Sequence, residues 1–280
     1  MNGRTLLLAT VLLVTPLSAE AQLAPRMWMA PNGDQLPFEA DEQILEFLRE
    51  AEIMAAEEIP AGTTRPQLVT LRRNGLEARA VFRWVEERAR RVDDASQHGE
   101  ITFRDSASFE TAAYELARLV NIDHVPPTVQ RTYDRRDGTL QLWIEGAMTE
   151  RNRLDQGAED PVQPRWQRQL GVMNVFDALV GNLDRNRGNM LIDQYWRVWF
   201  IDHTRAFRGS TRMDSDNLNA IEKALWDGLQ ALDHDVVRNR IAPFLTEREL
   251  TALLSRADLL VEHFQALIRK HGEDRVVYTY

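Results

Sequence analysis

Cysteine is absent from all 280 residues of this chain, and lysine is nearly absent. The lack of cysteine excludes a disulfide framework and any zinc site that depends on thiolates. Lys223 and Lys270 are the only lysines, so the first 222 positions contain none. An arginine must therefore stand wherever that part of the chain would otherwise use a lysine.

The chain also lacks the motifs of several enzyme classes. It has no G-x-x-x-x-G-K-[ST], H-E-x-x-H or G-x-S-x-G segment, which argues against P-loop enzymes, zinc metalloproteases and α/β-hydrolases. Its six histidines are scattered, and we expect them to be structural. The formal net charge of -9 argues against a general nucleic-acid binder, which normally carries a basic stripe.

A single long apolar run lies at the N-terminus. Residues 6–17 are largely apolar and follow the positive charge of Arg4, and Ala19-Glu20-Ala21 provides a small-residue cleavage site. This pattern predicts a signal peptide over residues 1–21 and export to the periplasm or the exterior, with an uncleaved anchor as the alternative. Residues 22–39 have no period and are expected to form a mobile leader. No stable membrane span is expected after cleavage.

Residues 40–150 predict a small lobe that mixes helices and strands. Apolar residues at helical spacing predict one helix over 41–58 with Asp41 as its N-cap, and another over 108–120. Ser106 or Ser108 is the expected cap of the second helix. Hairpins are expected over 66–85 across Asn74-Gly75 and over 129–144 across Asp137-Gly138, and the charged residues 88–101 are expected to be a loop.

The remainder predicts a second lobe. Residues 151–164 are polar and contain two prolines, which is typical of a linker between lobes. Helices are expected over 165–180, 218–232, 236–244 and 247–270, and short strands over 189–192 and 197–201. The sequence therefore predicts an α+β fold with a small sheet-containing N-lobe (40–150) and a mostly helical C-lobe (165–280).

Two aspartates and an asparagine are arranged around these short strands. Asp184 lies in the polar loop after the helix, Asn189 follows five residues later, and Asp202 lies at the end of the second strand. This order is the layout of a nucleotide–metal site. In such a site the first Asp accepts the proton of an attacking hydroxyl, while the Asn and the second Asp hold the divalent ions that bridge the phosphates.

A purely structural interpretation is also available. The D-R-N-R-G-N segment is rich in turn-forming residues, and an Asp after a helix is often a cap. Against this, the apolar residues of helix 165–180 would give the loop a buried support, and the apolar strand would direct Asp202 out of a hydrophobic wall. Arg185 and Arg187 could hold phosphate or a nearby acid. Together these features favour a functional site.

Four blocks within residues 59–210 carry a family resemblance. They are A80-V-F-R, then F109-E-T-A-A-Y-E-L-A-R-L-V with its tail V125-P-P-T-V-Q-R, then G138-T-L-Q-L-W-I-E-G, and finally M173-N-V-F-D-A-L-V-G-N-L-D-R-N. In their order and spacing the chain resembles the atypical kinases of the secretory pathway, the Golgi casein kinase group and its xylosylkinase relatives, as an exported member of bacterial type. Through N-L-D-R-N-R-G-N and I-D-H it is also similar to the phosphatidylinositol 3/4-kinases.

The resemblance implies a two-lobed protein-kinase-like fold and specific roles for the polar residues. It makes Asp184 the catalytic-loop Asp. It makes Asn189 and Asp202 the ligands of Mg or Mn. ATP is the implied cofactor, bound between the two lobes.

The resemblance also assigns the opposite wall of the nucleotide site. Glu110 matches the Glu of the helix that pairs with a strand cation, although a solvated Glu in the first turn of a helix is the common alternative. Residues 140–146 match the hinge strand whose backbone receives adenine. The nucleotide contacts expected there are Leu142, Trp143 and Ile144, and Trp143 could equally be a core residue.

The strand lysine of the family is the main departure. Its position falls on Arg83, and an arginine keeps the charge and can fork to phosphate or to Glu110, but with a longer, planar group. Three explanations stay open: an active enzyme that uses arginine, a pseudokinase that binds nucleotide, or a misaligned strand. The His of the H-R-D motif is also replaced, by Asn182.

The sequence thus leaves three functional hypotheses. The first is an ATP-dependent phosphotransferase that acts on a hydroxyl of a protein, a sugar or a lipid headgroup. The second is a nucleotide-binding pseudokinase or interaction module without turnover. The third, a purely helical interaction protein, leaves the paired Asp blocks unexplained. No nucleic-acid partner is expected, and the oligomeric state is open.

Overall fold

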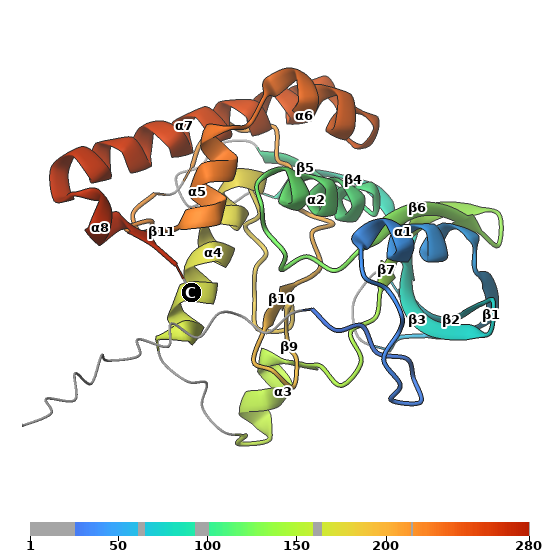
Figure 1. Cartoon of the computed structure of the whole chain (residues 1–280). Helices are drawn as coiled ribbons and strands as arrows, with labels where there is room; N and C mark the ends of the chain where they lie inside the picture. Colours follow the sequence, from blue (N-terminus) through green and yellow to red (C-terminus); the bar gives the residue numbers. More distant parts are fainter. Residues whose placement is uncertain (1–25, 61–64, 93–100, 159–163, 214, 280) are drawn as a thin grey trace, which may run out of the picture.

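The computed structural model describes residues 26–60, 65–92, 101–158, 164–213 and 215–279. The predicted signal peptide, residues 1–21, lies outside these ranges. Within them, no helix combines the length and the apolar character needed to cross a membrane. The chain forms two lobes, one built on a five-stranded sheet and the other mostly helical (Figure 1).

The N-terminal lobe is organised by an antiparallel sheet with the strand order β1-β2-β3-β7-β6. Its strands are β1 (Glu52–Glu58), β2 (Gln67–Arg73), β3 (Leu76–Arg83), β6 (Thr128–Tyr133) and β7 (Arg136–Leu142). Helices α1 (Asp41–Glu50) and α2 (Ser108–Leu119) both pack against β6 and β7. Helix α1 buries Ile44, Leu45, Phe47 and Leu48, and each such side chain stabilises the fold by roughly 1.5–3 kcal/mol.

The helix expected over residues 41–58 is wrong in its second half. Helix α1 ends at Glu50, Ala51 has an extended backbone, and Glu52–Glu58 forms strand β1. Strand β1 pairs with β2 from Glu52 opposite Arg72 to Glu58 opposite Gln67. Sheet pairing has overridden the helical pattern of this segment, as tertiary context often does. The N-cap is Ala40, because Asp41 instead pairs with Arg26 and accepts a hydrogen bond from Tyr114.

One predicted hairpin turn is confirmed and the other is displaced. Strands β2 and β3 meet across Asn74-Gly75, where both residues have positive φ. Strands β6 and β7 turn instead at Asp134 and Arg135, which also have positive φ. Gly138 belongs to β7. A Cβ at this position would lie 2.2 Å from the backbone oxygen of Arg83 on β3. This glycine permits close strand packing and does not form the turn.

The two ends of the charged segment expected to be a loop, residues 88–101, belong to strands instead. Strands β4 (Glu86–Val92) and β5 (Ile101–Ser106) form an antiparallel pair ahead of α2. Neither predicted serine caps α2, whose N-cap is Ala107 without a side-chain hydrogen bond. The Ser106 hydroxyl donates to Glu86, and the Ser108 hydroxyl donates to the backbone oxygen of Phe244. Both serines therefore tie α2 to neighbouring elements.

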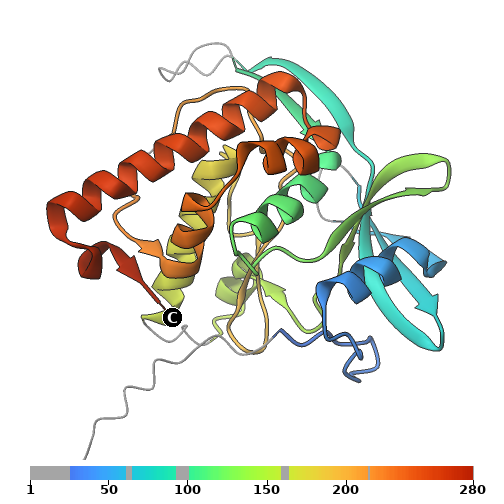
Figure 2. The ribbon, with the colours of Figure 1, turned by 45° about the horizontal axis from the view of Figure 1, so that its top comes forward.

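The C-terminal lobe contains the helices expected from the sequence and two short ones, over 150–155 and 273–276, that were not expected. They are α3 (Glu150–Asp155), α4 (Arg165–Val180), α5 (Lys223–Gln230), α6 (His234–Ile241), the 3-10 turn η1 (Ala242–Phe244), α7 (Glu247–His271) and α8 (Glu273–Val276). Figure 2 shows the long α7 running across α4, against which it packs. Helix α5 begins at Lys223, later than the predicted 218, because residues 221–222 form strand β11.

Two small sheets complete this lobe. Strands β8 (Met148–Thr149), β9 (Met190–Ile192) and β10 (Val198–Phe200) are antiparallel in the order β10-β9-β8, and β11 (Ile221–Glu222) pairs in parallel with β12 (Val277–Tyr278). The chain thus leaves the five-stranded sheet at Leu142 and joins the small sheet at Met148. This crossing precedes the expected linker at residues 151–164.

The end of α4 is held by a buried arginine from α7. Gly181 ends α4 in the left-handed conformation, and the guanidinium of Arg256 lies 3.0 Å from where its Cβ would be. Arg256 donates to the backbone oxygens of Leu179, Arg208 and Ser210. Burial lowers the pKa of Arg256 to about 10. The polar loop after α4 therefore starts from a fixed point.

Residues 26–36, expected as part of a mobile leader, pack against the core. Trp28 and Leu36 are buried, and the Trp28 ring lies 5.5 Å from the ring of Trp199 on β10. Met29 forms an isolated bridge with Gln35. The segment has no period because it packs as a short turn, and apolar contact with β10 orders it.

Candidate active site

The polar loop after α4 (residues 181–189) and the end of β10 bring the predicted Asp and Asn residues together. The side-chain amide of Asn189 donates to the backbone oxygen of Asp184 over 3.1 Å. The backbone amide of Ile201 donates to the backbone oxygen of Asn189 over 3.2 Å. Asp202 follows directly with a φ of 62°, a left-handed conformation that is uncommon for Asp and often marks functional sites.

Arg185 is the organising side chain of this loop. Its guanidinium makes two 2.9 Å hydrogen bonds to the carboxylate of Asp177 on α4. It also donates to the backbone oxygens of Asn189 and Ile201, each over 2.6 Å, and lies 3.0 Å from Nε2 of His203. Because its donors are directed to four partners at fixed angles, one arginine fixes the loop, the strand end and the helix together.

Asn182 strengthens the same arrangement. Its side-chain amide donates to Asp177 over 2.9 Å, and its side-chain oxygen accepts the backbone amide of Asp184 over 3.0 Å. Asn182 and Asp177 are both buried. The Asp184 backbone is thus set from below by α4, while its carboxylate stays partly exposed.

The predicted pair on the opposite wall is also present. Glu110 on α2 is fully buried and lies 3.8 Å from Nη1 of Arg83, the last residue of β3. Glu110 accepts the backbone amide of His203 over 3.1 Å and the side-chain amide of Gln141 over 3.4 Å. The alternative of a solvated Glu110 is therefore wrong, because α2 packs this turn against β7 and the segment after β10.

Charge interactions connect this pair with Asp202. Burial would raise the pKa of Glu110, but Arg83 and His203 outweigh it and lower the pKa to about 2. Burial raises the pKa of Asp202; Glu110 adds to the rise, while Arg83 opposes it. Arg83 therefore lies within electrostatic reach of carboxylates from both lobes. Its Nη1 is buried and has no hydrogen-bond partner among the described residues.

Two charged residues of the site had no signal in the sequence. Asp105, at the end of β5, is buried, and Nε of Arg205 donates to its Oδ2 over 2.8 Å. Nη1 of Arg205 lies 3.3 Å from Oδ2 of Asp184. Asp105 was missed because residues 88–101 were expected to be a loop, so no strand directed it toward the site. Arg205 was one of many arginines in the chain.

Solved structures with this architecture are known. A structure of hydra Fam20 with sugar superposes with a TM-score of 0.61 at 16% identity, covering 86% of this chain and 94% of that chain. A Golgi casein kinase gives 0.58 at 14% identity over 85% of this chain and 78% of its own. A structure of the Golgi casein kinase with Mn/ADP bound gives 0.57 at 16% identity, with 86% and 80% covered. The chain has an atypical kinase-like fold. No protein-family model and no curated protein matches its sequence.

In this kinase-like fold the hinge is the connection between the two lobes. The predicted hinge residues Leu142 and Ile144 are buried, and Trp143 is half-buried. Strand β7 ends at Leu142, and the backbone amide of Trp143 donates to the backbone oxygen of Arg79 on β3 over 2.9 Å. The Arg79 guanidinium lies over the Trp143 ring and pairs with Glu145. Trp143 thus contacts β3 and is not a core residue.

The donor set of the kinase-like fold suits a nucleotide-bound cation. Asn189 and Asp202 offer amide and carboxylate oxygens, the ligands that Mg²⁺ uses together with substrate phosphates. Within the described ranges, no group of three or more His, Cys, Asp or Glu side chains could hold a metal by itself. Nη1 of Arg83, which makes no hydrogen bond among the described residues, belongs to a guanidinium within electrostatic reach of Asp202 and would suit a phosphate oxygen.

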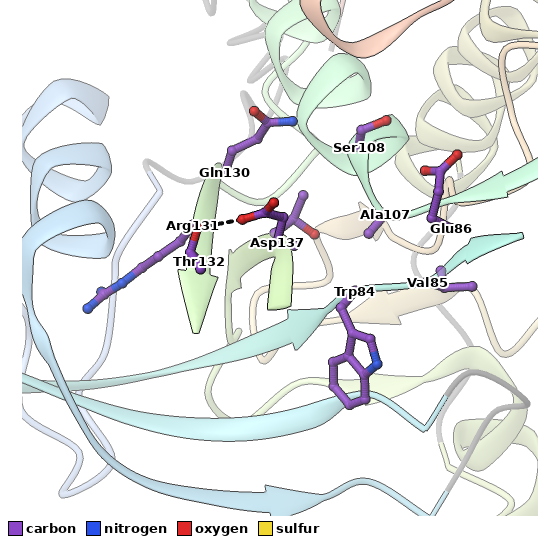
Figure 3. Close-up of a pocket in the computed structure, with 11 residues that line it drawn as sticks. Trp84, Val85, Glu86, Ala107, Ser108, Gln130, Arg131, Thr132 and Asp137 are labelled. Atoms are coloured by element: carbon purple, nitrogen blue, oxygen red, sulfur yellow. Dashed lines mark hydrogen bonds between the residues drawn. The ribbon is translucent and has the colours of Figure 1, made fainter. Parts of the chain in front are cut away.

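A cavity of about 530 Å³ lies elsewhere, at the outer end of the N-terminal sheet (Figure 3). It is lined by Trp84, Val85, Glu86, Ala107, Ser108, Gln130, Arg131, Thr132, Asp137, Gly138 and Thr139. Figure 3 shows Thr132 bonded to Asp137, while Arg131 points away toward the backbone of α1. None of these residues was predicted for the nucleotide site, but Trp84 follows Arg83 and Thr139 pairs with Arg83 across β3 and β7, so the hollow adjoins the N-terminal side of that site.

Proposed function

We propose that the protein is an ATP-dependent phosphotransferase of the atypical kinase type. One observation carries the proposal: Asp202, which follows the Asp184–Asn189 loop, lies within electrostatic reach of the Arg83–Glu110 pair from the other lobe. This is the arrangement in which a nucleotide would be held between two lobes with its phosphates toward the polar side. The acceptor is a hydroxyl of a protein, a sugar or a lipid headgroup.

In the proposed reaction, an oxygen of the acceptor forms a bond to the γ-phosphorus while the bond from that phosphorus to ADP breaks. Asp184 orients the acceptor hydroxyl and takes its proton, and ADP leaves with the bonding electron pair. Positioning and charge stabilisation supply most of the rate in such transfers. The loop built around Arg185 provides this positioning before any ligand arrives.

Asn189 and Asp202 would hold Mg or Mn, which neutralises phosphate charge when bound. The presence of Mn and ADP in the solved Golgi casein kinase supports this choice of cofactor. Arg83 would contact a phosphate through its unpartnered Nη1 while facing Glu110. Its fork can serve both at once, which suits an active enzyme that uses arginine.

A nucleotide-binding pseudokinase is the second candidate, favoured by the replacement of the strand lysine with Arg83. A thermal-shift titration separates binding from its absence: ATP with Mn²⁺ should raise the melting temperature, and Asp202→Ala should abolish the rise. If no nucleotide with either Mg²⁺ or Mn²⁺ shifts the wild type, both candidates fail.

Turnover then distinguishes the two candidates. Autophosphorylation or ATP hydrolysis should be measurable in the wild type and lost in Asp184→Ala, which should still bind nucleotide. Nucleotide binding without turnover would establish the pseudokinase. Equal turnover in Asp184→Ala would remove Asp184 from the proposed role.

We also propose that the mature protein is exported after cleavage near residue 21. The charge of Arg4, the apolar residues 6–17 and Ala19-Glu20-Ala21 support this proposal. N-terminal sequencing of the protein recovered outside the cytoplasm tests it. An intact Met1 in that fraction would favour the uncleaved anchor.

A further inference from the structure

Phosphoryl transfer requires positive charge near the oxygens of the transferring group, beyond what binds the rest of the nucleotide. The chain contains no lysine before position 223, so in that part of the chain a cation beside the transferring group must come from arginine or histidine. Arg83 lies on the N-terminal wall beside Glu110. The guanidinium of Arg185 already contacts Asp177, two backbone oxygens and His203.

Arg205 lies next to the proposed proton acceptor. Its Nη1 lies 3.3 Å from Oδ2 of Asp184, and its side chain is 37% exposed. Arg205 therefore contacts the carboxylate that faces the acceptor hydroxyl while staying accessible to a ligand. Its position three residues after Asp202 places it on the same segment as the proposed metal ligand.

Asp105, a buried residue of the other lobe, holds this arginine in place. Asp105 is 5% exposed, and its Oδ2 accepts Nε of Arg205 over 2.8 Å. The backbone amide of Ser106 donates to the backbone oxygen of Thr204 over 2.8 Å, so β5 and the Arg205 segment are joined beside the ion pair. Asp105 thus holds Nε, while Nη1 lies beside the carboxylate of Asp184. The bond to Asp105 also raises the pKa of Arg205.

We infer that Arg205 is a further catalytic residue that contacts the γ-phosphoryl group, and that buried Asp105 is its positioning residue. This inference rests on the proposed phosphotransfer. With nucleotide present, Nη1 or Nη2 of Arg205 donates to a γ-phosphate oxygen, while Nε stays on Asp105. The arginine gains and loses no bond to phosphorus; the acceptor oxygen attacks, ADP departs, and Asp184 takes the proton. Arg205 stabilises the negative charge on the transferring oxygens.

The decisive experiment compares ATP and ADP binding, since the two nucleotides differ by the γ-phosphate. Isothermal titration with Mn²⁺ would be carried out on the wild type, on Arg205→Gln and on Arg205→Lys. Arg205→Gln should weaken ATP binding by about tenfold, leave ADP binding within about twofold, and lower kcat by about 100-fold, the range seen when one charge-stabilising donor is removed. Arg205→Lys should recover part of the loss.

Further variants guard against a folding defect and test the role of Asp105. Arg205→Gln leaves Asp105 buried without its partner, so the Asp105→Asn/Arg205→Gln double variant removes both charges. Asp105→Asn alone should lower kcat more than it changes KM, and its effect should vanish in the Arg205→Gln background. Arg49→Gln, at an exposed arginine of α1 with no role in the proposed site, is the control and should match the wild type.

The outcomes separate this inference from the proposed function. If the wild type binds ATP and turns it over but the folded double variant keeps the same preference for ATP over ADP, the Arg205 assignment is overturned and the phosphotransferase stands. If Asp105→Asn acts equally with and without Arg205, its positioning role is overturned. If the wild type binds neither nucleotide, the proposed function fails and the inference falls with it.

Discussion

The two walls of the proposed nucleotide site differ in how completely their polar groups are satisfied. On the C-terminal side, Arg185 reaches Asp177, two backbone oxygens and His203, and Asn182 completes the set. On the N-terminal side, Arg83 lies 3.8 Å from Glu110, and its buried Nη1 has no partner among the described residues. The first wall is complete without a ligand, whereas the second has a donor available for one.

The two walls should therefore contribute differently to the stability of the fold and to ligand binding. The Asp184 loop is positioned by the protein alone, so the free energy that orders it is part of the free energy of folding. The Arg83 wall holds an unused donor whose desolvation is a cost until a phosphate arrives. Substitutions on the C-terminal wall should therefore reduce stability, and substitutions of Arg83 should mainly change binding.

The largest expected effect comes from Asp177→Ala, which removes the carboxylate under Arg185. The guanidinium is 9% exposed and would be left buried without its charge partner, so the free energy of unfolding should fall by about 3–5 kcal/mol. Urea unfolding measures the loss. Asp227→Ala, which breaks an exposed pair with Lys223, is the control and should cost less than about 1 kcal/mol. Equal losses in the two variants would contradict the central role of Arg185.

Glu110→Gln tests the one strongly stabilised charge of the N-terminal wall. The pKa of Glu110 is lowered from 4.5 to about 2, so its ionised form stabilises the fold above pH 4.5, and this contribution is lost as the pH falls toward 2. The variant should lose on the order of 3 kcal/mol at pH 7 and show a smaller further loss between pH 4.5 and 2.

Unfolding curves at several pH values measure the Glu110 effect. Glu115→Gln on the same helix, which lies 3.6 Å from Arg240, is the control and should keep the acid dependence of the wild type. An unchanged acid profile in Glu110→Gln would show that another group carries this dependence.

Arg83→Lys should separate binding from stability. Since Nη1 of Arg83 makes no hydrogen bond among the described residues, the free energy of unfolding should change by less than about 1 kcal/mol. The rise in melting temperature with ATP and Mn²⁺ should shrink, because a lysine cannot fork between Glu110 and a phosphate. A larger nucleotide shift or a gain of turnover would instead indicate that the arginine is disabling and would favour the pseudokinase.

The smallest effect is expected at the hinge. Arg79→Gln removes the ion pair with Glu145 and the contact over Trp143, but the arginine side chain is 33% exposed. The expected loss of stability is therefore about 0.5–1 kcal/mol, with a modest weakening of ATP binding. Differential scanning calorimetry and ATP titration test this. If Arg79→Gln lost more stability than Glu110→Gln, the hinge pair and not Glu110 would make the larger contribution to the stability of the N-terminal wall.

The secondary structure was predictable where one local signal dominated. The apolar period of residues 165–180, the Asn74-Gly75 turn and the pattern of α2 each led to the observed element. Predictions failed where the sheet decided. Residues 52–58 have a helical pattern but pair with β2, and Gly138 looks like a turn residue but lies in β7. Strand β2 is the next strand after β1, but the apolar spacing of residues 52–58 does not reveal the pairing, and the strand that Gly138 approaches, β3, is distant in sequence.

For the site, the sequence was sufficient to indicate which residues of the C-terminal wall the proposed chemistry would use. The spacing of Asp184, Asn189 and Asp202 depends on one loop and one hairpin, and such local spacing is visible in the chain. It also determined that arginine must replace lysine. Tertiary structure alone decided that Glu110 is buried against His203, that Arg185 holds the loop, and that Asp105 supports Arg205. These contacts join residues up to 100 positions apart, where burial and packing of separate elements, and no local pattern, set the distance.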